Sequence, residues 1–217
     1  MHDYVVTTYA YEHCRGPLPV PAGTSRFCIK GDFYRHMAET IVHLDAKTSG
    51  GLSALLAREG LRDFMTQQFL ATSFYDNLPL PRLTMCIAEV TQRDVFALTT
   101  KMGESSAERS MSGVYNRLLA PLTTTTFHRH FPGVISFFYN YAPLTVTLAA
   151  DGKSAELVRK DLPLAVAEWW CLVSVPFVKM PLEKNGAVGV DVKWRVAPSK
   201  AAGAVPLGDA TWAVTWA

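Results

Sequence analysis

The sequence has little of several features that mark common functions. Its 21 Lys and Arg residues are scattered and the formal net charge is only +2, which argues against a surface that follows a nucleic-acid backbone. The longest apolar stretch, residues 162–178, is interrupted by Glu168 and Pro176, whereas a membrane span needs roughly 20 apolar residues. The start, MHDYVVTTYAYEHCRG, lacks the features of a signal peptide. We therefore expect a cytoplasmic protein that binds neither nucleic acid nor membrane.

Metal and catalytic signatures are missing as well. The four cysteines form no Cys-x-x-Cys pair, and Cys86 and Cys171 stand in apolar surroundings that predict buried free thiols. No Walker loop, Gly-x-Gly-x-x-Gly, Gly-x-Ser-x-Gly or His-Glu-x-x-His segment occurs, which disfavours nucleotide-dependent enzymes and serine hydrolases. The sequence predicts no cofactor, no bound metal and no catalytic residue, and it leaves open whether the protein is an enzyme.

What the sequence does contain is a large apolar core. Hydrophobic residues make up 49% of the chain and charged residues 18%, a balance typical of a folded globular domain. Pro17, Pro19 and Pro21 predict an irregular segment over residues 1–26. Apolar residues at helical spacing follow from residue 32, so residues 27–133 are predicted as the helical part of a single domain over 27–217. Gly103 is expected to end one of its helices.

The second half, residues 134–217, changes from helical to strand periodicity after Pro132-Gly133. Apolar and polar residues alternate in LTVTL, VGVDVKWRV and TWAVTW, which indicates an antiparallel sheet with one covered face. Strands are predicted at 143–149, 154–160, 187–196 and 210–216, with a helix between the second and third that begins after Asp161. The predicted fold class is α+β: helices, then a four-stranded antiparallel sheet in the order β-β-α-β-β.

Two histidines in TTTTFHRHF, residues 123–131, are the first candidate site. Two positions apart on a helix, His128 and His130 point in different directions and cannot chelate one metal ion. We interpret them as the polar C-terminal end of a helix, where positive charge is favourable. Contact of His128 with a ligand stays open as an alternative.

Clustered aromatic residues are the second candidate site. FPGVISFFYNY and EWWCLVSVPF are rich in aromatic side chains, which either fill the core or line an apolar pocket between the helices and the sheet. The predicted pocket residues are Phe137, Phe138, Tyr139, Tyr141, Trp169 and His128, together with Glu168, whose carboxylate is costly to bury in this apolar segment. Trp169 and Trp170 point about 100° apart on a helix, so we expect one to pack on the sheet. The other should reach the helical half, a partner chain or a cavity.

Several short motifs resemble a known family. FYDNLPLPRL after a helix with two arginines, GVYNRLLAPL, and HRHFPGV before the strands are similar to the myxobacterial DUF2378 proteins. These in turn resemble the superfamily of haem-nitric-oxide-binding, vinyl-reductase-like and TRAPP-like domains. In its haem-binding branch, a His on a helix before the sheet ligates iron, and His128 stands at about that place. The Tyr-x-Ser-x-Arg motif that holds the propionates is missing, since YNYAP offers only Tyr139 and Tyr141.

Three functional hypotheses follow. The first is a non-catalytic protein that binds a small molecule in a mainly apolar pocket and acts in regulation or sensing, as a homodimer or through a partner protein. The second is a small accessory enzyme, or a precursor-binding protein, in a specialised-metabolite pathway. The third is a haem-type gas sensor.

Overall fold

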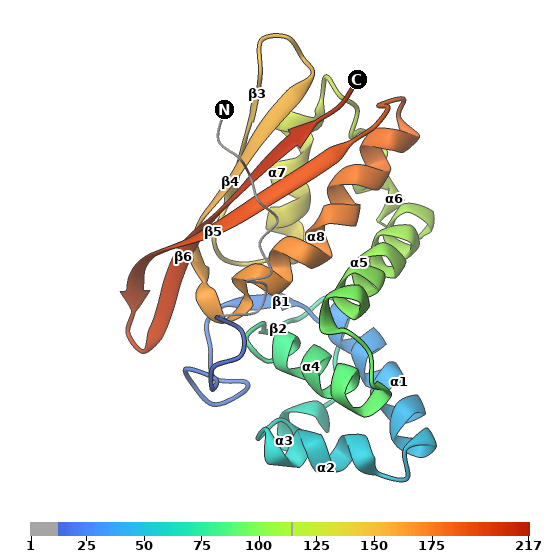
Figure 1. The fold of residues 1–217 in the computed structure, drawn as a ribbon, viewed down its shortest axis with the longest axis vertical. Helices are drawn as coiled ribbons and strands as arrows, with labels where there is room; N and C mark the ends of the chain where they lie inside the picture. The colour runs from blue at the N-terminus through green and yellow to red at the C-terminus, as the bar shows by residue number, and fades with distance from the viewer. Residues whose placement is uncertain (1–12, 114) are drawn as a thin grey trace.

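The computed structural model describes residues 13–113 and 115–217 of the chain, and Figure 1 shows its elements. Residues 13–26 carry no helix or strand. The helical half then contains β1 (Cys28–Lys30), α1 (Asp32–Lys47), α2 (Gly51–Arg58), α3 (Arg62–Met65), β2 (Phe74–Asp76), α4 (Pro79–Thr91), α5 (Val95–Ser112) and α6 (Asn116–Leu119). The remaining elements are α7 (Phe127–Phe138), β3 (Leu144–Leu148), β4 (Ser154–Pro163), α8 (Leu164–Lys184), β5 (Asp191–Ala202) and β6 (Val205–Thr215).

The predicted four-stranded antiparallel sheet is confirmed. Its strand order is β3-β4-β6-β5, and α7 and α8 cover one face (Figure 1). Trp212 and Val214 of β6 are buried on that covered face, as the alternation in the sequence predicts. Val188, predicted in the third strand, is instead 67% exposed because β5 begins only at Asp191. The fold class is therefore α+β, with the sheet strands in the predicted chain order.

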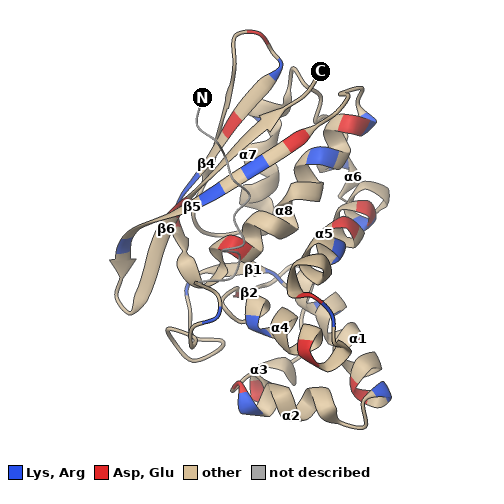
Figure 2. Cartoon of the chain, in the orientation of Figure 1, with Lys and Arg blue, Asp and Glu red and all other residues tan. Residues whose placement is uncertain are grey.

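Helix α8 is the centre of the core. It contacts α4, α5, β4, β5 and β6, and it alone among the described residues is long and apolar enough to cross a membrane. Within the fold, however, 72% of its most apolar window is buried. Such burial is what a core helix between a helical layer and a sheet requires. Charge is mixed on the surface, where Figure 2 shows Lys and Arg interspersed with Asp and Glu along α1, α5 and β5.

The predicted ends of two helices are wrong for a common reason, which is tertiary packing. Gly103 does not end a helix but lies buried inside α5, where a Cβ would stand 2.6 Å from the carbonyl oxygen of Val173 in α8. The glycine allows the close approach of the two helices. Similarly, α7 continues through Pro132 to Phe138 because its apolar face remains buried beyond the proline.

Helix α4 begins at Pro79, since proline suits the first turn of a helix. Two further corrections concern the starts of α8 and α7. Asp161 does not cap α8, which begins at Leu164; its backbone has φ 59° and its N–H donates to Asp209. His128 is the second residue of α7 and not part of its C-terminal end, so the expected favourable interaction with the helix dipole is absent.

The divergence of the two tryptophans is confirmed. Trp170 packs against the sheet, with its ring centroid 4.4 Å from that of Trp212. Trp169 points to the helical half, where its indole N–H donates to the Thr84 hydroxyl at 3.0 Å. Both side chains are 1% exposed. Thus α8 presents one tryptophan to each layer of the fold.

Candidate ligand-binding site

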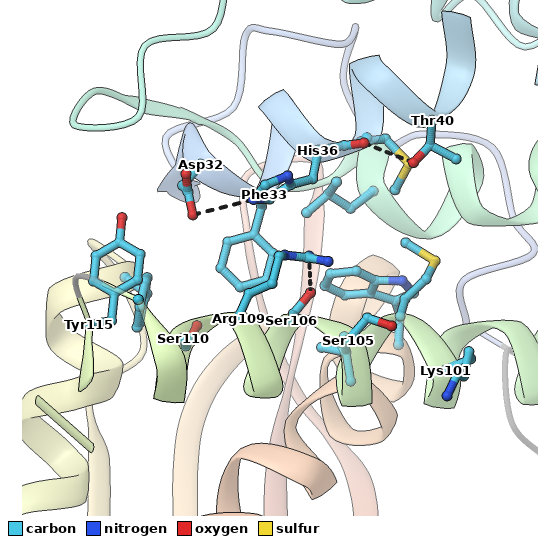
Figure 3. Close-up of a pocket in the computed structure, with 17 residues that line it drawn as sticks. Asp32, Phe33, His36, Thr40, Lys101, Ser105, Ser106, Arg109, Ser110 and Tyr115 are labelled. Atoms are coloured by element: carbon cyan, nitrogen blue, oxygen red, sulfur yellow. Dashed lines mark hydrogen bonds and ion pairs between the residues drawn. The ribbon is translucent and has the colours of Figure 1, made fainter. Parts of the chain in front are cut away.

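The principal cavity of the described residues lies between α1 and α5, above α8. Its volume is about 360 Å³, within the range of pockets that hold small molecules. Figure 3 shows α1 on one side and α5 on the other. The lining residues are Asp32, Phe33, His36, Met37, Thr40, Leu80, Lys101, Met102, Ser105, Ser106, Arg109, Ser110, Gly113, Tyr115, Phe138, Trp169 and Val173.

The floor of this cavity is apolar and fixed. Trp169 and Val173 come from α8, and the indole N–H of Trp169 is already satisfied by Thr84, whose hydroxyl donates in turn to the Leu80 carbonyl oxygen at 2.9 Å. The indole N–H of Trp169 therefore needs no hydrogen-bond acceptor from a ligand in the cavity. Gly103 sets the spacing between α5 and α8 beneath it. A ligand would meet a hydrophobic surface held by two rigid helices.

The rim of the cavity is polar and carries Asp32, His36, Lys101 and Arg109. On α1, His36 lies 3.9 Å from Asp32 and 3.5 Å from Glu39. On α5, Lys101 forms an ion pair with Glu104 at 3.1 Å. Arg109 donates to the Ser106 hydroxyl at 3.1 Å, and Figure 3 shows its side chain extending from α5 toward α1 beside Phe33.

Of the residues predicted to line a pocket, the structure brings Trp169 and Phe138 to this cavity. Phe137 is instead 41% exposed on the outer side of α7, with its ring centroid 5.7 Å from that of Tyr115. Adjacent residues on a helix diverge, so Phe137 and Phe138 cannot share one pocket wall.

Tyr139 and Tyr141 surround a different group, the guanidinium of Arg159 on β4. The central guanidinium carbon lies 4.4 Å from the Tyr139 ring, 4.8 Å from the Tyr141 ring and 4.3 Å from the Trp170 ring. Nε donates to the carbonyl oxygen of Ala142 at 2.6 Å, and Nη2 to that of Tyr141 at 2.9 Å. Burial lowers the pKa of Arg159 and raises that of Tyr141 to about 12. We call this closed arrangement the arginine cage.

Glu168 is explained by an ion-pair partner from the N-terminal segment. Its carboxylate accepts from the backbone N–H of His13 at 3.1 Å and lies 2.9 Å from His13 Nδ1. The adjacent Cys14 is buried, and desolvation by burial raises the pKa of its thiol, so it is a poor nucleophile. The carboxylate that stands out in the sequence fastens the N-terminal segment to α8 and does not face the cavity.

Sequence reasoning missed most of the rim. Its signal was present as repeats four residues apart: Asp32, His36 and Thr40 on α1, and Lys101, Ser105 and Arg109 on α5. Such a stripe is also typical of a solvent-exposed helix face. The two stripes form a cavity rim only because they lie opposite each other across an apolar floor, and the sequence of either helix alone does not show this.

Comparison with solved structures shows what this arrangement resembles. An H-NOX protein from T. tengcongensis has a TM-score of 0.57 at 11% identity, over 87% of this chain and 97% of that one. An unliganded Fe(II) H-NOX protein from K. algicida has a TM-score of 0.56 at 9% identity, with the same two coverages. An oxygen-binding H-NOX domain related to soluble guanylate cyclases has a TM-score of 0.54 at 10% identity, over 87% and 95%.

This chain has an H-NOX-like fold. No protein-family model matches the sequence, and no curated protein is similar to it in sequence. At identities of 9–11% the structural likeness establishes the fold and leaves the ligand to be argued from the site.

Among the described residues, neither His128 nor His36 is placed to ligate a haem in this cavity. His128, at the place that the family resemblance suggests, does not line this cavity, although its Nδ1 is buried without a hydrogen-bond partner among the described residues. The imidazole in the lining, His36, has its Nε2 3.9 Å from the Asp32 carboxylate and its Nδ1 3.5 Å from that of Glu39. Among residues 13–113 and 115–217, no group of three or more His, Cys, Asp or Glu side chains could hold a metal ion.

Proposed function

We propose that this protein binds a small molecule, without catalysis, in the cavity between α1 and α5, and that binding serves a regulatory or sensory role. One observation carries the proposal: an apolar floor, closed by Trp169 and Val173, lies beneath a polar rim in a cavity of about 360 Å³. A mainly apolar cavity with a few polar groups at its edge is typical of a small-molecule site. The H-NOX-like fold supports a sensory role by analogy only.

The contacts at the cavity favour binding over catalysis. The lining has hydroxyl groups on Thr40, Ser105, Ser106, Ser110 and Tyr115. None of them forms a hydrogen bond with an imidazole or a carboxylate in the described residues, whereas an activated nucleophile needs such a base within reach. An accessory enzyme would require a substrate that supplies its own reactive group.

A neutral fluorescent probe, phenylnaphthylamine, tests the proposal. It should bind with one molecule per chain and fluoresce more strongly as it leaves water. Ser105→Trp should abolish this binding because a large ring from α5 would fill the cavity, and Glu108→Trp, on the exposed side of the same helix, should not. Equal binding by both variants, or no binding by the parent protein, would show that the cavity is not a ligand site.

The absorption spectrum of the purified protein tests the haem alternative. We expect no Soret band after incubation with haem, because His128 does not line the cavity and the imidazole of His36 faces Asp32 and Glu39. A Soret band that disappears in His128→Ala or His36→Ala would establish the haem-type sensor and name its ligand. The finer assignment to the DUF2378 proteins rests on the short sequence motifs alone.

A further inference from the structure

We infer that the ligand of this cavity is an amphipathic anion, with its negative group bound by Arg109 at the rim and its apolar body on Trp169. This inference rests on the proposed function and makes it specific. It follows from the balance of charges around the rim and from the position of Arg109 above the apolar floor.

Most charges at the rim are already paired. Lys101 forms its ion pair with Glu104, and Asp32 faces His36 one helical turn away. Asp32 also lies in the first turn of α1, where a carboxylate is stabilised by the helix dipole. These groups can contribute to solubility and helix stability without any ligand.

Arg109 differs from these groups because no carboxylate of the described residues forms an ion pair with it. Its guanidinium forms one hydrogen bond within the described residues, from Nη2 to the Ser106 hydroxyl at 3.1 Å. Ser106 lies one turn earlier on α5 and itself lines the cavity. The hydroxyl holds the guanidinium at the rim while the other N–H donors stay available.

The chemistry of a guanidinium decides what it would bind. Its planar N–H donors match the two oxygens of a carboxylate, or those of a sulfonate or phosphate, in a bidentate pair. Phe33, beside Arg109 in Figure 3, and Met102 line the cavity and are partly exposed, and Trp169 closes its floor. A ligand with one negative end and an apolar body of one or two rings would satisfy both parts of the site.

Two probes that share a ring system test the inference. Anilinonaphthalene sulfonate carries a negative group that phenylnaphthylamine lacks, so the ratio of their dissociation constants measures the contribution of the charge. We expect the sulfonate to bind more tightly. Arg109→Gln should weaken its binding about tenfold, the usual effect of losing a charge-assisted hydrogen bond, and should leave the neutral probe unaffected.

Two control variants test whether the effect on sulfonate binding depends on the position and on the sign of the charge. Arg129→Gln removes the same charge from an exposed site on α7 outside the cavity lining and should change neither probe. Asp32→Asn removes a negative charge from the rim and should tighten sulfonate binding by about twofold to threefold. Thermal unfolding of each variant shows that it is folded.

The outcomes separate the two proposals. If the neutral probe binds in the cavity but Arg109→Gln leaves the sulfonate unaffected, the anionic ligand is wrong and the binding function stands. If neither probe binds, both proposals fail. If Arg129→Gln weakens the sulfonate as much as Arg109→Gln, general surface charge explains the preference, and the assignment to Arg109 is wrong.

Discussion

Trp169 and Trp170 are neighbours on α8 and equally buried, yet they belong to regions of opposite character. Trp169 lies at the floor of the cavity between α1 and α5, whose rim is partly exposed. Trp170 stands in closed packing, against Trp212 of the sheet and over the guanidinium of Arg159. One helix therefore separates an open region, suited to a ligand, from a closed region that holds the domain together.

The two arginines of these regions sharpen the contrast. Arg159 is 0% exposed and has three rings and two carbonyl oxygens around it, although its Nη1 has no partner in the described residues. Arg109 is exposed and has only the Ser106 hydroxyl. A cation that the protein itself surrounds serves the fold, while a cation at the edge of an open apolar cavity is available to a ligand.

The largest expected effect is on the closed side. Arg159→Ala should lower the free energy of unfolding by ~3–5 kcal/mol, since it empties the arginine cage and leaves the carbonyl oxygens of Tyr141 and Ala142 without donors. Arg109→Ala should change it by less than about 0.5 kcal/mol, as expected of an exposed residue. Urea denaturation of both variants measures this difference.

Two results would break the contrast between the arginines. If Arg109→Ala destabilises the protein as much as Arg159→Ala, Arg109 is part of the fold and not a free ligand-binding group. If Arg159→Ala is as stable as the parent protein but no longer binds anilinonaphthalene sulfonate, the arginine cage is coupled to the cavity. The two sides of α8 would then form one site.

The next effect concerns the boundary between the two regions, at Gly103. Gly103→Ala should destabilise the protein by about 1–3 kcal/mol, because its Cβ would stand 2.6 Å from the Val173 carbonyl oxygen and would push α5 from α8. Gly133→Ala is the matched control inside α7, where a Cβ meets nothing within 4 Å. It should stabilise the protein by roughly 0.5–1 kcal/mol through helix propensity.

Probe binding gives Gly103 a second measurement. Because Gly103 sets the spacing between α5 and α8, which both line the cavity, its replacement should also weaken phenylnaphthylamine binding, and Gly133→Ala should not. A Gly103→Ala protein that is more stable than the parent would mean that α5 can shift freely, and the floor of the cavity would then not be rigid.

The sheet and the direction of the tryptophans could be predicted because each follows from local geometry. Alternation in TWAVTW fixes which side chains face inward, and a turn of 100° per residue separates Trp169 from Trp170. The ends of α5 and α7 could not, because Gly103 and Pro132 are helix breakers whose effect depends on what packs against them. Tertiary contact overrides propensity at both positions.

The candidate site was harder to predict than the fold. Clustered aromatic residues in the sequence indicated Phe138 and Trp169 as pocket residues, and both line the cavity. The same cluster also contained Tyr139 and Tyr141, which surround Arg159. Aromatic composition does not distinguish a cage from a cavity wall. The difference depends on what the aromatic side chain faces, and that residue comes from a distant part of the chain.

The smallest expected effect is a dependence on alkaline pH that belongs to the closed side. Burial raises the pKa of the Cys171 thiol on α8 well above its ordinary value and that of Tyr141 to about 12. In the unfolded chain a thiol titrates near about 8.5 and a phenol near about 10. Above those values the unfolded chain has released protons that the folded chain keeps, so the free energy of unfolding falls as the pH rises.

Cys171→Ala isolates one thiol of this closed side. Between pH 8 and pH 9 the free energy of unfolding of the parent protein should fall. The free energy of unfolding of the variant should fall by roughly 0.5–1 kcal/mol less, because its unfolded chain has one proton fewer to release. Urea denaturation at the two pH values gives both changes, so a constant packing loss from the substitution cancels. Probe affinity should remain the same over this pH range, since Cys171 does not line the cavity. Equal pH dependence in parent and variant would mean that the Cys171 thiol ionises as readily in the folded protein, and the region around Trp170 would then be open to water.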